Sequence, residues 1–219
     1  MLERVELIVK EKLKDIVSKK VLIIGLGGVG SYALETLVRT GIKEFVIVDG
    51  DKIDISNLNR QLMTDTTNIG KHKTDIWEER IFKINPKCKI TKITKFITKA
   101  EEVLFDNVDY VIDACDTLET KKEIIKYCLE NKIEFISAMG MGNRLDATKV
   151  IITTLDKTNN DPLAKKMRFL MKDIKGKIPV VCSTEIPKKQ SVIGSLSYVP
   201  ATAGLMITNY IINDILKEE

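Results

Sequence analysis

A glycine-rich turn between a short apolar run and a helical segment constrains this chain more than any other feature. Residues 20–24 form the apolar run, residues 25–30 read Gly-Leu-Gly-Gly-Val-Gly, and residues 29–40 have helical spacing. The four glycines are Gly25, Gly27, Gly28 and Gly30. Glycines in such a turn let the backbone approach a phosphate, and the N-terminus of the following helix favours negative charge. The turn therefore predicts a nucleotide site, with a tight structural turn as the alternative.

The rest of the chain alternates strands and helices. Further strands are predicted at 44–48, 88–93, 109–112 and 134–137, and helices at 70–84 and 117–131. This alternation predicts an α/β fold with a Rossmann-like, doubly wound, mostly parallel sheet. After residue 146 we expect short β runs, a basic helix over 161–173, a loop over 186–190 and a closing helix over 201–216. We expect one domain, 1–219, with a nucleotide-binding core at 1–146 and a C-terminal β/α extension at 147–219.

Composition and charge narrow the class of protein. A chain of 219 residues with 44% hydrophobic content is the size of one α/β domain. The net charge of +4 is small, but the stretch from Lys157 to Lys189 has nine basic and three acidic residues. This stretch therefore carries +6 and the rest of the chain −2. We expect the basic stretch to meet an anion.

The termini and cysteines predict where the protein works. The first 20 residues carry charges every few positions and no apolar signal-peptide region, so we expect a cytoplasmic protein. The most apolar stretch, 192–216, is interrupted by Pro200, Asn209, Asn213 and Asp214, which argues against a membrane span. The cysteines are far apart without a C-x-x-C pair, so no zinc site or redox dithiol is expected. They are Cys88, Cys115, Cys128 and Cys182.

Polar residues after the second strand favour ATP over a nicotinamide cofactor. Asp49 ends that strand and can accept hydrogen bonds from ribose hydroxyls, although it can instead cap a turn. Asp51, Asn57, Arg60 and Gln61 follow it, at the edge of the sheet where ligands of open α/β sheets bind.

Two cations in this region point to a polyphosphate. Arg60 can contact triphosphate oxygens with two N–H groups, and Lys73 stands near the start of the next predicted helix. Each of them taken alone is more often a solvated surface cation, so the prediction rests on their joint placement.

Carboxylates after the strand at 109–112 are candidates for holding Mg²⁺. Asp116 is the stronger candidate and Asp113 its support, with a helix cap as the alternative for Asp116. His72 has no triad-like partners and is interpreted as a loop residue. Cys182 is more readily a buried strand cysteine than a nucleophile.

Taken together, these features resemble the ThiF/MoeB-type adenylyltransferases, relatives of the ubiquitin-activating enzymes. Within that superfamily the sequence most resembles the tRNA threonylcarbamoyladenosine dehydratases over nearly the whole chain. The segments that carry this finer resemblance are 4–7, 84–86, 137–146, 161–165 and 180–185.

The resemblance implies a reaction that spacing alone does not reveal. Such enzymes use ATP to activate the carboxylate of the threonylcarbamoyl group on a tRNA adenosine, which then cyclises with loss of water. By this resemblance Arg60 and Lys73 bind phosphates, Asp116 binds Mg²⁺ and supports adenylation, and Asp49 holds the ribose. The ring closes within the substrate, so no enzyme thiol is required and Cys182 is expected to be dispensable.

The resemblance also implies partners. The tRNA backbone is expected to meet a basic set of residues: Arg144, Lys165, Lys166, Arg168, Lys172, Lys175 and Lys177. A charged solvent face is the alternative. A homodimer is expected, with 192–216 as its contact region and Arg4 reaching the partner subunit's phosphate site. A monovalent cation near 137–143 and a sulfur-relay protein partner are left open.

Three other functions remain as alternatives. The first is adenylation of the C-terminus of a ubiquitin-like sulfur carrier, against which the lack of paired C-x-x-C zinc ligands counts. The second is a nucleotide-bound interaction subunit without turnover. The third is an NAD oxidoreductase.

Overall fold

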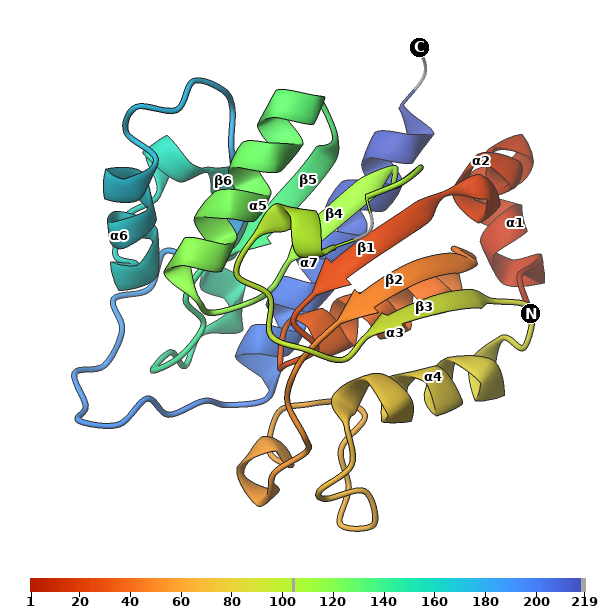
Figure 1. Cartoon of the computed structure of the whole chain (residues 1–219), viewed down its shortest axis with the longest axis horizontal. Coiled ribbons are helices and arrows are strands. Elements are labelled where there is room, and N and C mark those ends of the chain that lie inside the picture. The colour runs from red at the N-terminus through yellow and green to blue at the C-terminus, as the bar shows by residue number, and fades with distance from the viewer. Residues whose placement is uncertain (104, 218–219) are drawn as a thin grey trace.

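The core of the protein is a seven-stranded sheet. The computed structural model describes residues 1–103 and 105–217, and its strand order is β3-β2-β1-β4-β5-β7-β6 (Figure 1). Strand β6 pairs antiparallel with β7, and the other pairings are parallel. The strands are β1 Lys20–Ile24, β2 Glu44–Val48, β3 Lys89–Ile93, β4 Tyr110–Asp113, β5 Glu134–Ala138, β6 Val150–Thr154 and β7 Pro179–Ser183. The predicted α/β fold with a mostly parallel sheet is confirmed.

Helices cover both faces of the sheet, as a doubly wound fold requires. They are α1 Glu3–Val9, α2 Leu13–Ser18, α3 Gly30–Thr40, α4 Lys73–Ile84, α5 Leu118–Asn131, α6 Pro162–Leu170 and α7 Tyr198–Leu216. Short 3₁₀ helices are η1 Lys10–Lys12, η2 Ile55–Asn57, η3 Ala100–Glu102, η4 Ala147–Lys149 and η5 Leu155–Lys157. Figure 1 shows α5 and α6 in front of the sheet and α7 behind it.

Each face of the sheet has its own hydrophobic core, because successive side chains of a strand point to opposite sides. Val21 and Ile23 of β1 pack in the core that also contains residues of α3, α4 and α7. Leu22 and Ile24 pack in the core on the side of α5 and α6. Within the described part of the chain, no helix is long and apolar enough to cross a membrane.

Three helix boundaries differ from the predicted ones by more than one residue. Helix α4 begins at Lys73 rather than near residue 70, because His72 is extended and pairs with Lys52 in an isolated bridge. Helix α6 ends at Leu170, where the chain turns towards β7. Helix α7 begins at Tyr198, before Pro200, because a proline in a first helical turn gives up no helical hydrogen bond.

The C-terminal region belongs to the same sheet as the rest. Strand β7 lies between β5 and β6, and α7 packs against α3. This contact is close because Gly204 has no side chain: a Cβ there would lie 2.5 Å from the carbonyl oxygen of Val29. The division into a core at 1–146 and an extension at 147–219 stays a prediction.

Candidate functional site

The glycine turn lies where the carboxyl ends of β1, β2 and β4 meet. Gly25 leaves β1 with a φ of +91°, and its N–H donates to the carbonyl of Val48 at the end of β2 (2.8 Å). A Cβ at Gly25 would lie 2.6 Å from the carbonyl oxygen of Ala114. A Cβ at Gly30 would lie 1.9 Å from the carbonyl oxygen of Gly25. Only glycine fits these positions, and the turn delivers the N-terminus of α3 to this edge of the sheet.

Asp49 fastens the glycine turn to the end of β2. Its carboxylate accepts hydrogen bonds from the N–H of Leu26 (2.7 Å) and the N–H of Asp51 (2.8 Å). The ammonium of Lys73 lies 2.6 Å from Asp51 and 3.5 Å from Asp49. Lys73 itself is only 4% exposed. The structure therefore brings the predicted residues Asp49, Asp51 and Lys73 together. The alternative that Asp49 caps a turn accounts for its hydrogen bonds from the N–H groups of Leu26 and Asp51.

The loop after η2 places the other predicted residues beside the turn. A Cβ at Gly28 would lie 3.4 Å from Cγ of Arg60, and a Cβ at Gly27 would lie 3.9 Å from Nε2 of Gln61. Arg60 donates from Nη1 to the carbonyl of Ser56, 2.7 Å away. Arg60 and Gln61 thus lie directly over the turn.

Gln61 and Asn57 differ in what they offer a ligand. Gln61 is 5% exposed, and within the described residues its Oε1 has no hydrogen-bond partner. A buried amide oxygen without a hydrogen-bond donor is unfavourable, and a ribose hydroxyl of a bound nucleotide can supply that donor. Asn57 instead uses its Oδ1 to accept from the N–H of Asp54, which holds η2 in place (3.1 Å).

The two candidate metal carboxylates have different surroundings. Asp116 is exposed in the loop between β4 and α5, whose N-cap is Thr117, so Asp116 does not cap that helix. Asp113 is fully buried, accepts from the hydroxyl of Ser137 (2.6 Å) and pairs with Lys121 (2.9 Å). The Asp113 carboxylate is thus occupied inside the protein and is not free to bind a metal ion itself, and its supporting role for Asp116 stays a prediction.

The donor set around Asp116 fits Mg²⁺ only together with a nucleotide. Across residues 1–103 and 105–217, no three His, Cys, Asp or Glu side chains form a cluster that could hold a metal ion. Magnesium beside phosphates is held by one or two carboxylates, with phosphate oxygens and water as the other ligands. One exposed carboxylate, in a loop whose Ala114 and Cys115 lie against Gly25, is compatible with that pattern.

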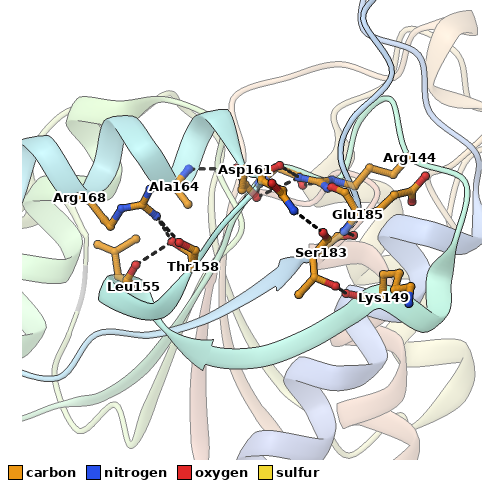
Figure 2. A network of polar contacts seen from close by, with 12 residues as sticks. Arg144, Lys149, Leu155, Thr158, Asp161, Ala164, Arg168, Ser183 and Glu185 are labelled. Carbon is orange, nitrogen blue, oxygen red and sulfur yellow. Dashed lines mark hydrogen bonds and ion pairs between the residues drawn. The ribbon is translucent and has the colours of Figure 1, made fainter.

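Arg144 is a buried structural residue rather than a surface cation. It is 2% exposed, and its guanidinium donates to the carbonyls of Gly140 (3.0 Å), Asn160 (3.1 Å) and Glu185. The same guanidinium pairs with Asp161 at 3.5 Å (Figure 2). The prediction that Arg144 contacts tRNA is wrong, because its charge and donors tie together three loops at the ends of β5 and β7.

The other predicted tRNA contacts lie on or next to α6. Arg168 is half-buried and donates to the carbonyl and hydroxyl of Thr158 (Figure 2). Lys165, Lys166 and Lys172 are exposed. The exposed lysines are open to a phosphate backbone, and their role stays a prediction.

The comparison with known proteins shows the family of the chain. Residues 2–219 match the sequence model of the ThiF family. The chain belongs to the ThiF family. The tRNA threonylcarbamoyladenosine dehydratase of Bacillus subtilis (strain 168) is 36% identical over 232 residues, 95% of this chain and 91% of that protein. The enzyme of the same name from Escherichia coli (strain K12) is 38% identical over 192 residues, 83% of this chain and 72% of that protein.

Two solved structures of the E. coli enzyme resemble this ThiF family chain over nearly its whole length. The crystal structure of the E. coli tRNA N6-threonylcarbamoyladenosine dehydratase in complex with AMP matches with a TM-score of 0.91. Its complex with ATP matches with a TM-score of 0.89. Both are 34% identical to this chain, and each match covers 96% of this chain and 91% of that one. The predicted family resemblance is confirmed.

The cysteines of this ThiF family member are poor nucleophiles. Burial and, to a smaller extent, the nearby charge of Asp161 raise the pKa of Cys182 to about 11, against the opposing effect of Arg144. Burial likewise raises the pKa of Cys128 to about 12 and that of Cys88, and burial with the Asp113 charge raises that of Cys115. These thiols stay protonated at neutral pH.

Sequence reasoning missed Lys121 and named Ser137 only as the start of the 137–143 loop; both residues are fully buried next to Asp113. One signal was available for Lys121. It lies three, four and seven positions before Ile124, Ile125 and Cys128, so helical periodicity places a charged residue on the apolar face of α5.

Proposed function

We propose that this chain is an ATP-dependent tRNA threonylcarbamoyladenosine dehydratase. The observation that carries the proposal is the gathering of the glycine turn, the Lys73 ammonium and the Arg60–Gln61 loop at one edge of the sheet. The likeness to the dehydratases of B. subtilis and E. coli, over most of each chain, supports the choice of substrate.

The chemistry needs two steps on one substrate. An oxygen of the threonylcarbamoyl carboxylate attacks the α-phosphorus of ATP, and pyrophosphate leaves. A nitrogen of the same substituent then attacks the acyl carbon, loses its proton and expels AMP, so that the modified base loses one water overall. Ring closure within one molecule gains about 7–11 kcal/mol from proximity, so the enzyme's main tasks are placement and charge neutralisation.

The residues at the edge divide these tasks. Arg60 and Lys73 hold phosphate oxygens, and Asp49 and Gln61 hold the ribose. Asp116 binds Mg²⁺, which supplies positive charge at the phosphates when it is bound. The contacts of Asp49 and the places of Arg60 and Gln61 beside the glycine turn support these assignments.

Partners complete the proposal. The exposed lysines of the α6 region position the tRNA backbone. Because its substrate is tRNA, we propose that the enzyme works in the cytoplasm. We also propose a homodimer in which Arg4 serves the partner subunit's site. Arg4 is an exposed residue of α1, and α1 lies at the other end of the strands from the glycine turn, which favours a role at the site of another subunit (Figure 1). A monovalent cation near 137–143 and a sulfur-relay partner stay predictions.

Nucleoside mass spectrometry tests the proposal directly. The purified protein is incubated with ATP, Mg²⁺ and tRNA that carries the open threonylcarbamoyladenosine, and the digested nucleosides are weighed. Loss of one water's mass from the modified nucleoside, with AMP and pyrophosphate as products, is expected. An unchanged mass would refute the proposal, and transfer of AMP to the tail of a ubiquitin-like sulfur carrier would favour the adenylyltransferase alternative.

A further inference from the structure

A buried, charged cluster lies beneath the proposed nucleotide edge, and none of the roles in the proposed reaction belongs to it. Lys121 of α5, Asp113 at the end of β4 and Ser137 of β5 are each 0% exposed. Nζ of Lys121 lies 2.9 Å from Oδ2 of Asp113 and 3.2 Å from Oγ of Ser137. The Ser137 hydroxyl donates to the same Asp113 oxygen (2.6 Å). The three groups satisfy one another inside the protein.

Stability alone is a weak reason for such a cluster. Removing two charges from water is unfavourable, and an apolar pair of similar volume usually stabilises a fold at least as well. Directional hydrogen bonds do something that apolar packing does not, because they fix the position and rotation of the groups they join. The cluster therefore fixes the position of Asp113, and with it the groups that Asp113 contacts in turn.

The other oxygen of Asp113 holds the loop that carries Asp116. Oδ1 accepts from the backbone N–H of Cys115 (3.3 Å) and from its thiol (3.1 Å). The other side of the 114–116 loop packs against the glycine turn, since a Cβ at Gly25 would lie 2.9 Å from the Cys115 nitrogen. Ala114 and Cys115 are thus held between the buried cluster and the turn, directly before Asp116.

We propose that Lys121 is a positioning residue for adenylation: through Asp113 it holds the 114–116 loop so that the Asp116 carboxylate keeps its place beside the glycine turn. The inference rests on the proposed function of Asp116. Lys121 does not touch the substrate, and Ser137 completes the cluster by fixing the Asp113 carboxylate from the neighbouring strand.

The main test removes both charges at once. Lys121→Met alone leaves a buried carboxylate without its partner and threatens folding, whereas Asp113→Asn with Lys121→Met leaves a neutral pair. The double variant is expected to melt close to the wild type and to bind ATP within about threefold of it, since Asp49, Arg60 and Lys73 are untouched. Its rate of pyrophosphate release with modified tRNA is expected to fall by about 10- to 100-fold, as for a misplaced catalytic group. Lys126→Met, on the exposed face of α5, is the matched control.

Thiol labelling gives a readout that does not depend on activity. In the wild type the Cys115 thiol is engaged with Asp113, and iodoacetamide is expected to label it slowly. In the double variant the loop is released and labelling of Cys115 is expected to accelerate, while buried Cys88, Cys128 and Cys182 keep their rates. A purely structural cluster would change all four rates or none.

Ser137→Ala is a second test that does not depend on the folding of the double variant. It removes one hydroxyl and is expected to slow pyrophosphate release while the KM for ATP is unchanged. Wild-type rates and labelling in a folded double variant, or in Ser137→Ala, would overturn the inference. Unaltered activity of Asp116→Ala would also overturn it, whereas a wild-type enzyme that releases no pyrophosphate with modified tRNA would overturn the proposed function itself.

Discussion

The ammonium of Lys73 lies 2.6 Å from the carboxylate of Asp51, 22 positions earlier in the chain. A second carboxylate, that of Asp49, lies 3.5 Å away. An ammonium has three N–H donors, so these two contacts leave one donor for a phosphate oxygen. The pair thus holds Lys73 in one orientation beside the glycine turn, and it balances the charge of a lysine that is almost fully buried.

This arrangement predicts unequal effects of substitution at the two positions. Lys73→Met is expected to lower the rate of pyrophosphate release by about 10²- to 10³-fold, the range for loss of a preorganised charge in a site. Asp51→Asn keeps the ammonium and is expected to have a much smaller effect. Single-turnover rates with modified tRNA measure both. Equal losses in the two variants would contradict the phosphate role of Lys73.

Arg60 is expected to act through its two-pronged geometry as well as its charge. Arg60→Lys keeps the charge and loses the paired N–H groups, so both Arg60→Lys and Arg60→Ala are expected to weaken ATP binding, Arg60→Ala more strongly. Isothermal titration with ATP measures the affinity. Lys52→Ala, an exposed cation on the same loop, is the control. Unchanged ATP affinity in both variants would remove Arg60 from the phosphate site.

Much of this fold is readable from the sequence because local patterns determine it. The strand over 20–24, the glycine turn and the strand over 44–48 were predicted at their observed bounds, since alternation, glycine and helical spacing all act within a few residues. The same local logic identified Asp49, Arg60 and Lys73 as neighbours of the turn.

Two buried charged residues escaped or misled this reasoning. Arg144 was predicted as an RNA contact together with other basic residues of the chain, yet it is buried and its partner Asp161 comes from a different loop. Lys121 was not singled out because its partner Asp113 belongs to another element. A charged residue type does not reveal whether a carboxylate from elsewhere will neutralise it inside the protein.

Cys182 is expected to be dispensable for the reaction. The pKa of its thiol is about 11, so almost no thiolate exists at neutral pH. Cys182→Ala is expected to keep the wild-type rate of cyclisation and to melt at a somewhat lower temperature, because a buried sulfur is lost from β7. Nucleoside mass spectrometry and thermal melts measure the two effects. Loss of cyclisation in a folded variant would show that the thiol takes part.

Glu35 predicts a pH dependence of stability. Burial acts to raise the pKa of its carboxyl, but hydrogen bonds from Arg80 (2.7 and 2.9 Å) and Arg39 (2.8 Å) outweigh it, and the pKa lies below its ordinary 4.5. The ionised carboxylate therefore stabilises the fold above about pH 4.5, and this contribution is lost as pH falls through the lower pKa of the folded state. Glu35→Gln is expected to destabilise by about 1–3 kcal/mol at pH 7. Urea unfolding at several pH values measures the free energy of unfolding of both proteins. If the difference between the wild type and Glu35→Gln grew as the pH was lowered, ionised Glu35 would not be the stabilising group.

The lysines of the α6 region predict how tRNA affinity depends on salt. Each lysine that neutralises a phosphate releases counterions, so removing it lowers the slope of log affinity against log salt by about 0.7–0.9. Lys165→Ala with Lys166→Ala is therefore expected to reduce the slope by about two such steps, to raise the KM for tRNA and to leave ATP binding unchanged. Lys12→Ala with Lys14→Ala, in the N-terminal helices at the opposite edge of the sheet, is the matched control. Filter binding across a salt series measures the slope, and equal slopes for the α6 variant and the wild type would mean that this charged face is solvated and does not contact the tRNA.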